Sequence, residues 1–171
     1  MASINGVSIK KLTEFLDHEG LTIFQGNVYI DNKLQGSWSQ DYMCGPDIFR
    51  FNDDELAKRA MAFSKGVPVD DVQYHSIYEE SGILLYLLTK LMDDEKEFKK
   101  AFKAGYVSIA IVDDKMGSVS VIKSREPIDE KMLQRFDGFK GRDDYRIYNS
   151  LDDFNIVVNE NNPAPKFIYK E

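Results

Sequence analysis

The sequence predicts an α+β fold in which several helices pack against an antiparallel sheet built from two β-hairpins and short late strands. Three observations carry this prediction. The run Ile83 to Leu88 holds six consecutive apolar or aromatic residues, so we expect a buried central helix around 72–92. Two stretches, 27–39 and 106–123, alternate apolar and polar residues around a polar turn, as hairpins do. The 171 residues suit one globular domain, 1–171.

The first elements are a tight turn and a helix. Asn5-Gly6 favours a turn with positive φ. Residues 8–20 are predicted to be helical because Ser8 suits an N-cap and Gly20 a C-terminal cap. Four apolar residues also share one face at helical spacing: Ile9, Leu12, Phe15 and Leu16.

A hairpin and a second helix follow. Asp31-Asn32-Lys33 is a polar turn, which predicts that four apolar residues meet across the hairpin: Val28, Ile30, Leu34 and Trp38. The aperiodic segment Gln40 to Asp47 predicts a loop before a short strand, Ile48 to Phe51. The second helix begins near Asn52 and stops at Gly66.

The central helix is expected to begin near Val72. Asp93-Asp94-Glu95 is a helix-start signal, so we predict that a further helix begins there and stops at Gly105. After the second hairpin, Pro127 suits the first turn of a helix whose inner face is formed by four residues: Ile128, Met132, Leu133 and Phe136.

The last third predicts short elements. We predict two short strands, Tyr145 to Tyr148 and Ile156 to Val158. Between them we predict a helical turn, Ser150 to Phe154. Residues 159–171 are polar and twice interrupted by proline, which predicts a loosely held, extended tail.

Composition excludes several classes of function. A net charge of −7 and a pI near 4.9 argue against broad attachment to nucleic acid or to anionic membranes, but not against a local basic patch. The one cysteine, Cys44, excludes an intramolecular disulfide and a zinc site built from several thiolates. We expect a cytoplasmic protein, with no secretory signal and no membrane span.

No cofactor motif is found, and we expect neither a cofactor nor a metal. Phosphate-binding loops and His/Cys metal spacings are both missing from the sequence. Cys44, with His18 or His75 as base and Asp41 or Asp47 to orient it, is the residue set of a cysteine hydrolase, but no motif surrounds the cysteine. His18 also suits the end of a helix, where a cation is favoured.

The loop Gly138-Phe139-Lys140-Gly141-Arg142 is basic and carries an aromatic residue that we expect to be exposed. Such a loop is able to touch a nucleic-acid backbone. A flexible connection between a helix and a strand is the favoured interpretation.

Seven acidic doublets are the most distinctive feature: Asp53-Asp54, Asp70-Asp71, Glu79-Glu80, Asp93-Asp94, Asp113-Asp114, Asp143-Asp144 and Asp152-Asp153. An acidic surface of this kind imitates the phosphates of a nucleic acid. Five doublets are also explained as helix starts or a hairpin turn, which leaves Glu79-Glu80 and Asp143-Asp144 without a local role. Trp38 and Tyr42, beside Met43, are candidates for a contact patch because aromatic residues and Met are enriched at interface centres.

The segments Phe24-Gln-Gly-Asn-Val-Tyr-Ile-Asp-Asn-Lys33, Gly36-Ser-Trp-Ser-Gln-Asp41 and Gly45-Pro46 resemble the opening of small uncharacterised proteins of phages and conjugative elements of Gram-positive bacteria. The resemblance covers residues 20–50 and transfers no catalytic residue. It implies that the gene lies on a mobile element. Such elements encode small acidic proteins that block host defences, including anti-CRISPR and antirestriction proteins.

The leading hypothesis is a non-enzymatic acidic binding protein that inhibits a host nucleic-acid-binding defence protein, such as a nuclease. Its expected contacts with a basic surface are Trp38, Asp41, Tyr42, Met43, Asp47, Glu79, Glu80, Asp143 and Asp144. The alternative is a metal-dependent enzyme acting on nucleic acid or a nucleotide through carboxylates, assisted by His75. A structural or regulatory module without an acidic interface is the third possibility.

Overall fold

The computed structural model describes residues 1–40, 46–67, 80–113, 119–142 and 145–163, and it confirms the α+β class. The strands form two sheets instead of the one that we predicted, and each sheet contains one of the two predicted hairpins. The first sheet has the order β5 (Ile48–Phe49), β4 (Lys33–Ser39), β3 (Thr22–Ile30), β2 (Val7–Leu16), β1 (Ser3–Ile4) and β9 (Asn155–Ile156). The second has the order β7 (Val119–Ser124), β6 (Ser108–Asp113) and β8 (Tyr145–Tyr148). All pairings are antiparallel except that of β1 with β9.

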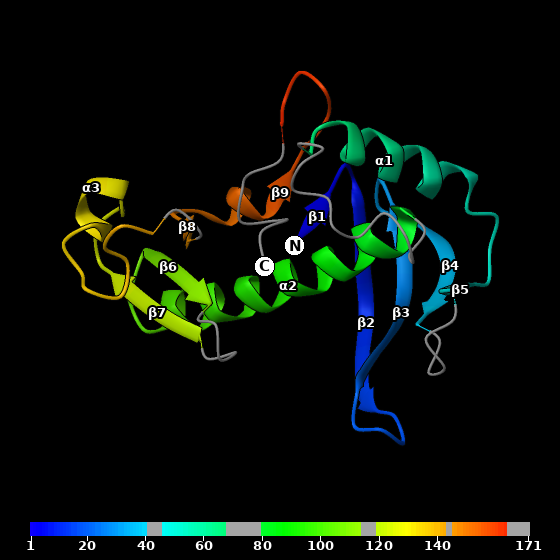
Figure 1. The fold of residues 1–171 in the computed structure, drawn as a ribbon, viewed down its shortest axis with the longest axis horizontal. Coiled ribbons are helices and arrows are strands. Elements are labelled where there is room, and N and C mark those ends of the chain that lie inside the picture. Colours follow the sequence, from blue (N-terminus) through cyan, green and yellow to red (C-terminus); the bar gives the residue numbers. More distant parts are fainter. Residues whose placement is uncertain (41–45, 68–79, 114–118, 143–144, 164–171) are drawn as a thin grey trace.

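The long helix α2 (Glu80–Lys103) connects the two sheets. Figure 1 shows it running along the molecule, with the first sheet at one end and the second at the other. α1 (Asp54–Lys65) packs beside it, and α3 (Glu130–Leu133) and the 3₁₀ turn η2 (Leu151–Phe154) are short. No helix among the described residues is long and apolar enough to cross a membrane.

The central helix is longer than predicted at one end, and its predicted start near Val72 lies outside the described residues. α2 continues through Asp93, so the prediction of a new helix there is wrong. The apolar run is well covered, since Leu84, Leu85 and Leu88 are fully buried and the other three residues of the run are half-buried. The helix does end before Gly105 as predicted.

The predicted helix over 8–20 is wrong, because β2 occupies most of it. Asn5-Gly6 forms the expected turn, with φ of 50° and 76°, and pairs Ile4 with Val7. β2 then pairs with β3, and one extra residue between Lys10 and Thr13 makes a β-bulge. The bulge changes the alternation, so Ile9 and Leu12 both pack on the core. Their spacing of three therefore imitates a helix.

The other expected elements are largely present. Asp31 and Asn32 have φ of 47° and 65°, and they form the two-residue turn between β3 and β4. Leu34, however, is 57% exposed opposite Tyr29, because a second register shift follows Val28. β5, β8, β9 and η2 lie where short elements were predicted.

Two late predictions need correction. The helix after Pro127 is shorter than predicted, and Phe136 is exposed instead of facing inward. Asn159 to Asn162 form a hydrogen-bonded turn, not an extended tail, while residues 164–171 lie outside the described part.

The core has two parts, on the two faces of the second sheet. The main part joins the first sheet, α1 and α2, and it includes Ile109 and Ile111 of β6. The alternate β6 residues, Ala110 and Val112, form the second part with residues around α3 such as Leu133. β6 is thus buried on both faces.

Candidate partner-binding surface

Three of the nine predicted contact residues are described: Trp38, Asp47 and Glu80. Trp38 is only 1% exposed, and its Nε1 donates to Oδ2 of Asp47 over 2.7 Å. Trp38 therefore belongs to the core, which corrects its assignment to a contact patch. A Cβ placed on Gly82 would lie 2.8 Å from Oδ2 of Asp47, so Asp47 packs against the first turn of α2, the turn in which Glu80 stands. The other six lie outside the described residues: Asp41, Tyr42, Met43, Glu79, Asp143 and Asp144.

Asp94 forms hydrogen bonds that stabilise the fold. Its carboxylate accepts from Nε of Arg146 at 2.6 Å and from Nη2 at 3.2 Å, and the hydroxyl of Tyr148 donates to it at 2.7 Å. Burial and the nearby negative charge of Asp94 raise the pKa of Tyr148 well above its ordinary value, so this hydroxyl stays a donor. The cluster ties α2 to β8.

Glu95, the next residue, is 5% exposed and binds the N-terminal segment. Its carboxylate lies 3.0 Å from the α-amino group of Met1 and 2.9 Å from Nζ of Lys99, and it accepts from the Ala2 amide at 3.1 Å. Burial opposes ionisation of Glu95, but these hydrogen bonds outweigh it and lower the pKa. Asp94 and Glu95 are therefore cross-links of the fold, not a contact surface.

Other acidic residues also have local roles. Oδ2 of Asp153 accepts from the amides of Asn149 and Ser150, as expected at a helix start. Asp53 precedes α1 but makes no capping hydrogen bond; the Asn52 side chain accepts from the Asp54 amide instead.

The predicted nucleic-acid loop lacks its exposed aromatic residue. Phe139 is 2% exposed and packs in the second core. The Gln134 side chain holds the loop by donating to the carbonyls of Phe139 and Arg142 and accepting from the Gly141 amide. Stacking of a base on Phe139 is therefore excluded.

The predicted catalytic residues do not assemble a site in the described chain. Cys44 and His75 lie outside the described residues. His18 lies in an exposed turn, not at a helix end, with Nε2 3.8 Å from Glu19. Among the residues described, no three His, Cys, Asp or Glu side chains gather as metal ligands would.

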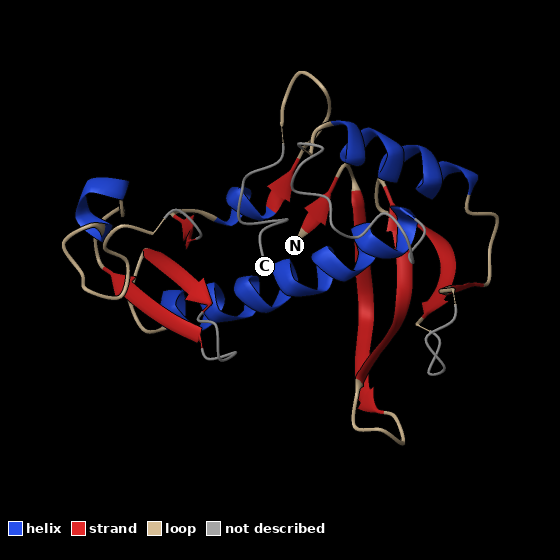
Figure 2. Cartoon of the chain, in the orientation of Figure 1, coloured by secondary structure: helices blue, strands red, loops and turns tan. Residues whose placement is uncertain are grey.

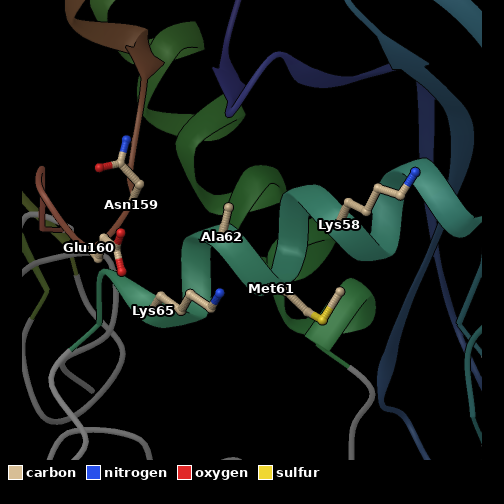
Figure 3. A pocket seen from close by; sticks show the side chains of 6 residues that line it. All are labelled: Lys58, Met61, Ala62, Lys65, Asn159 and Glu160. Carbon is tan, nitrogen blue, oxygen red and sulfur yellow. The ribbon is translucent and has the colours of Figure 1, made fainter.

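A groove of about 280 Å³ runs along α1 (Figure 3). It is lined by Lys58, Met61, Ala62, Lys65, Asn159 and Glu160. Figure 3 shows Met61 between the two lysines, and Glu160 beside Lys65. None of these polar side chains is buried, and Lys58 lies 3.6 Å from Glu55. The groove offers no preorganised polar site.

A two-stranded arm is the most prominent feature of the surface. Beyond the bulge, β2 and β3 project from the body as a hairpin, here called the arm (residues 11–25), which Figures 1 and 2 show clearly. Its turn is well held. The Asp17 amide donates to the Leu21 carbonyl over 2.9 Å, and Oδ1 of Asp17 accepts from the amides of Glu19 and Leu21, each at 2.8 Å. Gly20 has a φ of 83°, which favours glycine.

The end of the arm is apolar and exposed. Phe15, Leu16 and Leu21 are 45%, 69% and 50% exposed, and we call these three residues the arm tip. Phe15 pairs with Ile23 and Leu16 with Thr22, so neighbouring strand positions direct the two side chains to opposite faces. Exposed apolar side chains on a preorganised support are typical of a protein contact.

The charge around the arm tip is negative. Residues 12–32 contain no Lys or Arg, whereas Glu14, Asp17 and Glu19 all lie near the tip. The pKa of Lys96 on α2 is raised chiefly by its hydrogen bond with Asp93, which outweighs burial, and more weakly by the charge of Glu14. The arm tip thus combines exposed apolar side chains with nearby carboxylates, and Lys96 of α2 is a cation that lies near Glu14. This excess of negative charge complements a basic surface.

The sequence prediction missed the arm because Phe15 and Leu16 were assigned to the inner face of a helix. One signal was available. Asp17-His18-Glu19-Gly20 is a turn signal between two apolar segments, Phe15-Leu16 and Leu21 to Phe24. The bulge at Lys11, a non-glycine residue with a φ of 53°, has no such signal.

Comparison of the chain with protein-family models, with curated proteins and with solved structures found no match. The resemblance of residues 20–50 to proteins of mobile elements therefore stays a prediction.

Proposed function

We propose that the chain is an acidic binding protein that docks on a basic protein surface through the arm tip. The exposure of Phe15, Leu16 and Leu21 on a hydrogen-bonded turn is the observation that carries this proposal. These side chains lie far out on the arm, where they add little to the core, and a partner that covers them gains about 25 cal/mol per Å² of apolar surface. Such preorganised apolar anchors are typical of interface hot spots.

The partner we propose is a nucleic-acid-binding protein, such as a defence nuclease of a host bacterium. A net charge of −7 and an arm tip without Lys or Arg oppose binding to nucleic acid itself, but they favour the basic groove that binds it. The resemblance of residues 20–50 supports an anti-CRISPR or antirestriction role. Eight predicted contacts stay part of the proposal: Asp41, Tyr42, Met43, Asp47, Glu79, Glu80, Asp143 and Asp144.

The test is binding to a panel of purified CRISPR nucleases and restriction enzymes, measured by biolayer interferometry. For the partner that binds, Phe15→Ala and Leu21→Ala are each expected to raise Kd about tenfold or more, as truncation of a hot-spot residue does. The matched control is Leu34→Ala, which removes an equally exposed apolar side chain at the other end of β3 and β4. Added target nucleic acid should compete with the wild-type chain.

Two results would contradict the proposal. If the whole panel fails to bind, the proposed inhibition of these defence proteins is wrong. If Phe15→Ala and Leu21→Ala bind as tightly as the wild type, the arm tip is not the docking element.

A further inference from the structure

The outer edge of β2 is open along the arm. On one side β2 pairs with β3 from Val7 to Leu16, while on the other side β1 pairs with it only at Val7. No described strand covers the outer edge at Thr13 to Leu16, and all four of these residues are exposed. An exposed strand edge carries backbone groups that are ready to pair with another chain.

The hydrogen-bond pattern identifies which residues offer those groups. The Asp17 amide donates inward, to Leu21 of the opposite strand. Antiparallel strands alternate inward and outward positions, so Leu16 and Glu14 direct their N–H and C=O outward. The pairing on β3 agrees: Phe24, opposite Glu14, accepts from the Gln40 amide at 3.0 Å on the side away from β2. Two residues thus present two donors and two acceptors.

The side chains beside this edge determine which kind of strand is able to bind to it. Glu14 and Leu16 share one face of the strand and Phe15 lies on the other, so a strand laid alongside places alternate side chains against the face with Glu14 and the face with Phe15. Lys or Arg opposite Glu14 and apolar residues opposite Phe15 satisfy both faces. A second copy of this chain is disfavoured, because each copy has a net charge of −7.

We propose that β2 binds an extended segment of the partner with alternating basic and apolar residues, which adds a strand to the first sheet. This inference rests on the proposed role of the arm as the docking element. Backbone hydrogen bonds to Glu14 and Leu16 supply binding, and the alternation of side chains supplies selectivity, as in other cases of strand addition.

The first experiment uses a blocked eight-residue peptide of alternating lysine and valine, and amide hydrogen exchange of the full chain measured by NMR. The amides of Glu14 and Leu16 are expected to exchange about tenfold more slowly with excess peptide, because bonding to a new strand protects them. The Phe15 amide, already bonded to β3, should change less. A peptide of alternating glutamate and valine is the charge control and should give no protection.

Other outcomes overturn the proposal. Protection confined to Val119 to Ser124 would place the peptide on the open edge of β7 instead. Protection of Glu14 and Leu16 that rises with protein concentration in the absence of peptide would assign the edge to a second copy. No protection at either residue would exclude strand addition at β2.

The second experiment separates strand addition from docking by the arm tip. Leu16→Pro removes an outward N–H and should leave the β2–β3 pairing intact, as proline does on strand edges. Leu16→Ala matches the loss of side chain, and Thr22→Pro removes the outward N–H on the opposite edge at the same level of the arm. We expect Leu16→Pro to weaken binding of the lysine–valine peptide at least tenfold relative to both controls. Trp38 fluorescence checks the fold.

Equal peptide binding by Leu16→Pro and Leu16→Ala would overturn strand addition. The docking proposal would survive that result if Phe15→Ala and Leu21→Ala still weaken binding of the protein partner. If Leu16→Pro does not fold, the exchange measurement on the wild type decides.

Discussion

Two adjacent carboxylates show how much a single residue depends on its neighbours. Asp94 and Glu95 stand in the middle of α2, yet in the sequence they look like the start of a helix. A helix-start carboxylate is expected to cap backbone amides, whereas these two bind Arg146 and Tyr148 on one side and the N-terminal segment on the other. Their partners are far away in the sequence, so no local pattern could have predicted these roles.

Glu95 predicts a dependence of stability on acid pH. Its pKa is lowered in the folded protein, so its ionised form stabilises the fold above the ordinary value of 4.5, and that contribution is lost as the pH falls through the lowered pKa. We expect Glu95→Gln to be less stable at neutral pH and to lose less stability between about pH 5 and pH 2. Urea unfolding at several pH values measures both effects.

Glu160→Gln, which changes an exposed carboxylate, is the control for this acid titration. Parallel losses of stability in Glu95→Gln and the wild type would exclude Glu95 as a source of the acid dependence.

At the level of elements, local sequence signals predicted turns better than they predicted which strands pair with each other. The Asn5-Gly6 turn, the Asp31-Asn32 turn and the end of α2 follow from residues that tolerate the required backbone angles. β2 was missed because a bulge gave Ile9 and Leu12 the spacing of a helix. The arm tip was missed together with β2. The tip is exposed because β4 ends beside β3 before reaching it, and the sequence does not indicate that end. Propensity alone does not determine that pairing.

The end of α2 carries a prediction of its own. Gly105 has a φ of 85°, the Tyr106 amide donates to the Ala101 carbonyl, and the Gly105 amide donates to Phe102, which together form a Schellman motif. Nothing lies within 4 Å of a Cβ placed on Gly105. Gly105→Ala should therefore lower the free energy of unfolding by about 1 kcal/mol through backbone strain alone.

Gly138→Ala is the matched control, because Gly138 has equally open surroundings and no left-handed φ. It should be neutral or slightly stabilising in the same urea titration. A Gly105→Ala variant as stable as Gly138→Ala would show that the backbone at Gly105 is not strained by a side chain.

At the scale of the whole molecule, α2 explains why two sheets replace the single sheet that was predicted. One main core contains residues of both sheets, and α2 supplies the apolar surface between them. The apolar run Ile83 to Leu88 predicted a buried helix, but it did not predict which elements bury it. Strands with alternating apolar and polar residues have the same sequence pattern whichever sheet they belong to. The α+β class was therefore predictable, whereas the division into two sheets was not.

This shared core predicts that both sheets unfold together. Leu88 is fully buried in it, so Leu88→Ala should lower the free energy of unfolding by roughly 3 kcal/mol. We expect the same shift of midpoint from Trp38 fluorescence, which reports the first sheet, and from protection of the Ile109 and Ile111 amides in the second. Different midpoints for the two reporters would mean that the sheets unfold separately.

The turn at Asn5-Gly6, in which Asn5 is buried, also affects how the protein ages chemically. An Asn-Gly pair readily loses the side-chain amide as ammonia, when the glycine nitrogen attacks Cγ of the asparagine and closes a succinimide ring. Here Nδ2 of Asn5 donates to the Arg59 carbonyl over 3.2 Å, and Oδ1 accepts from the Val158 amide over 2.7 Å. Ring closure has to break both bonds, so deamidation at Asn5 should proceed through the unfolded fraction and storage lifetime should follow conformational stability.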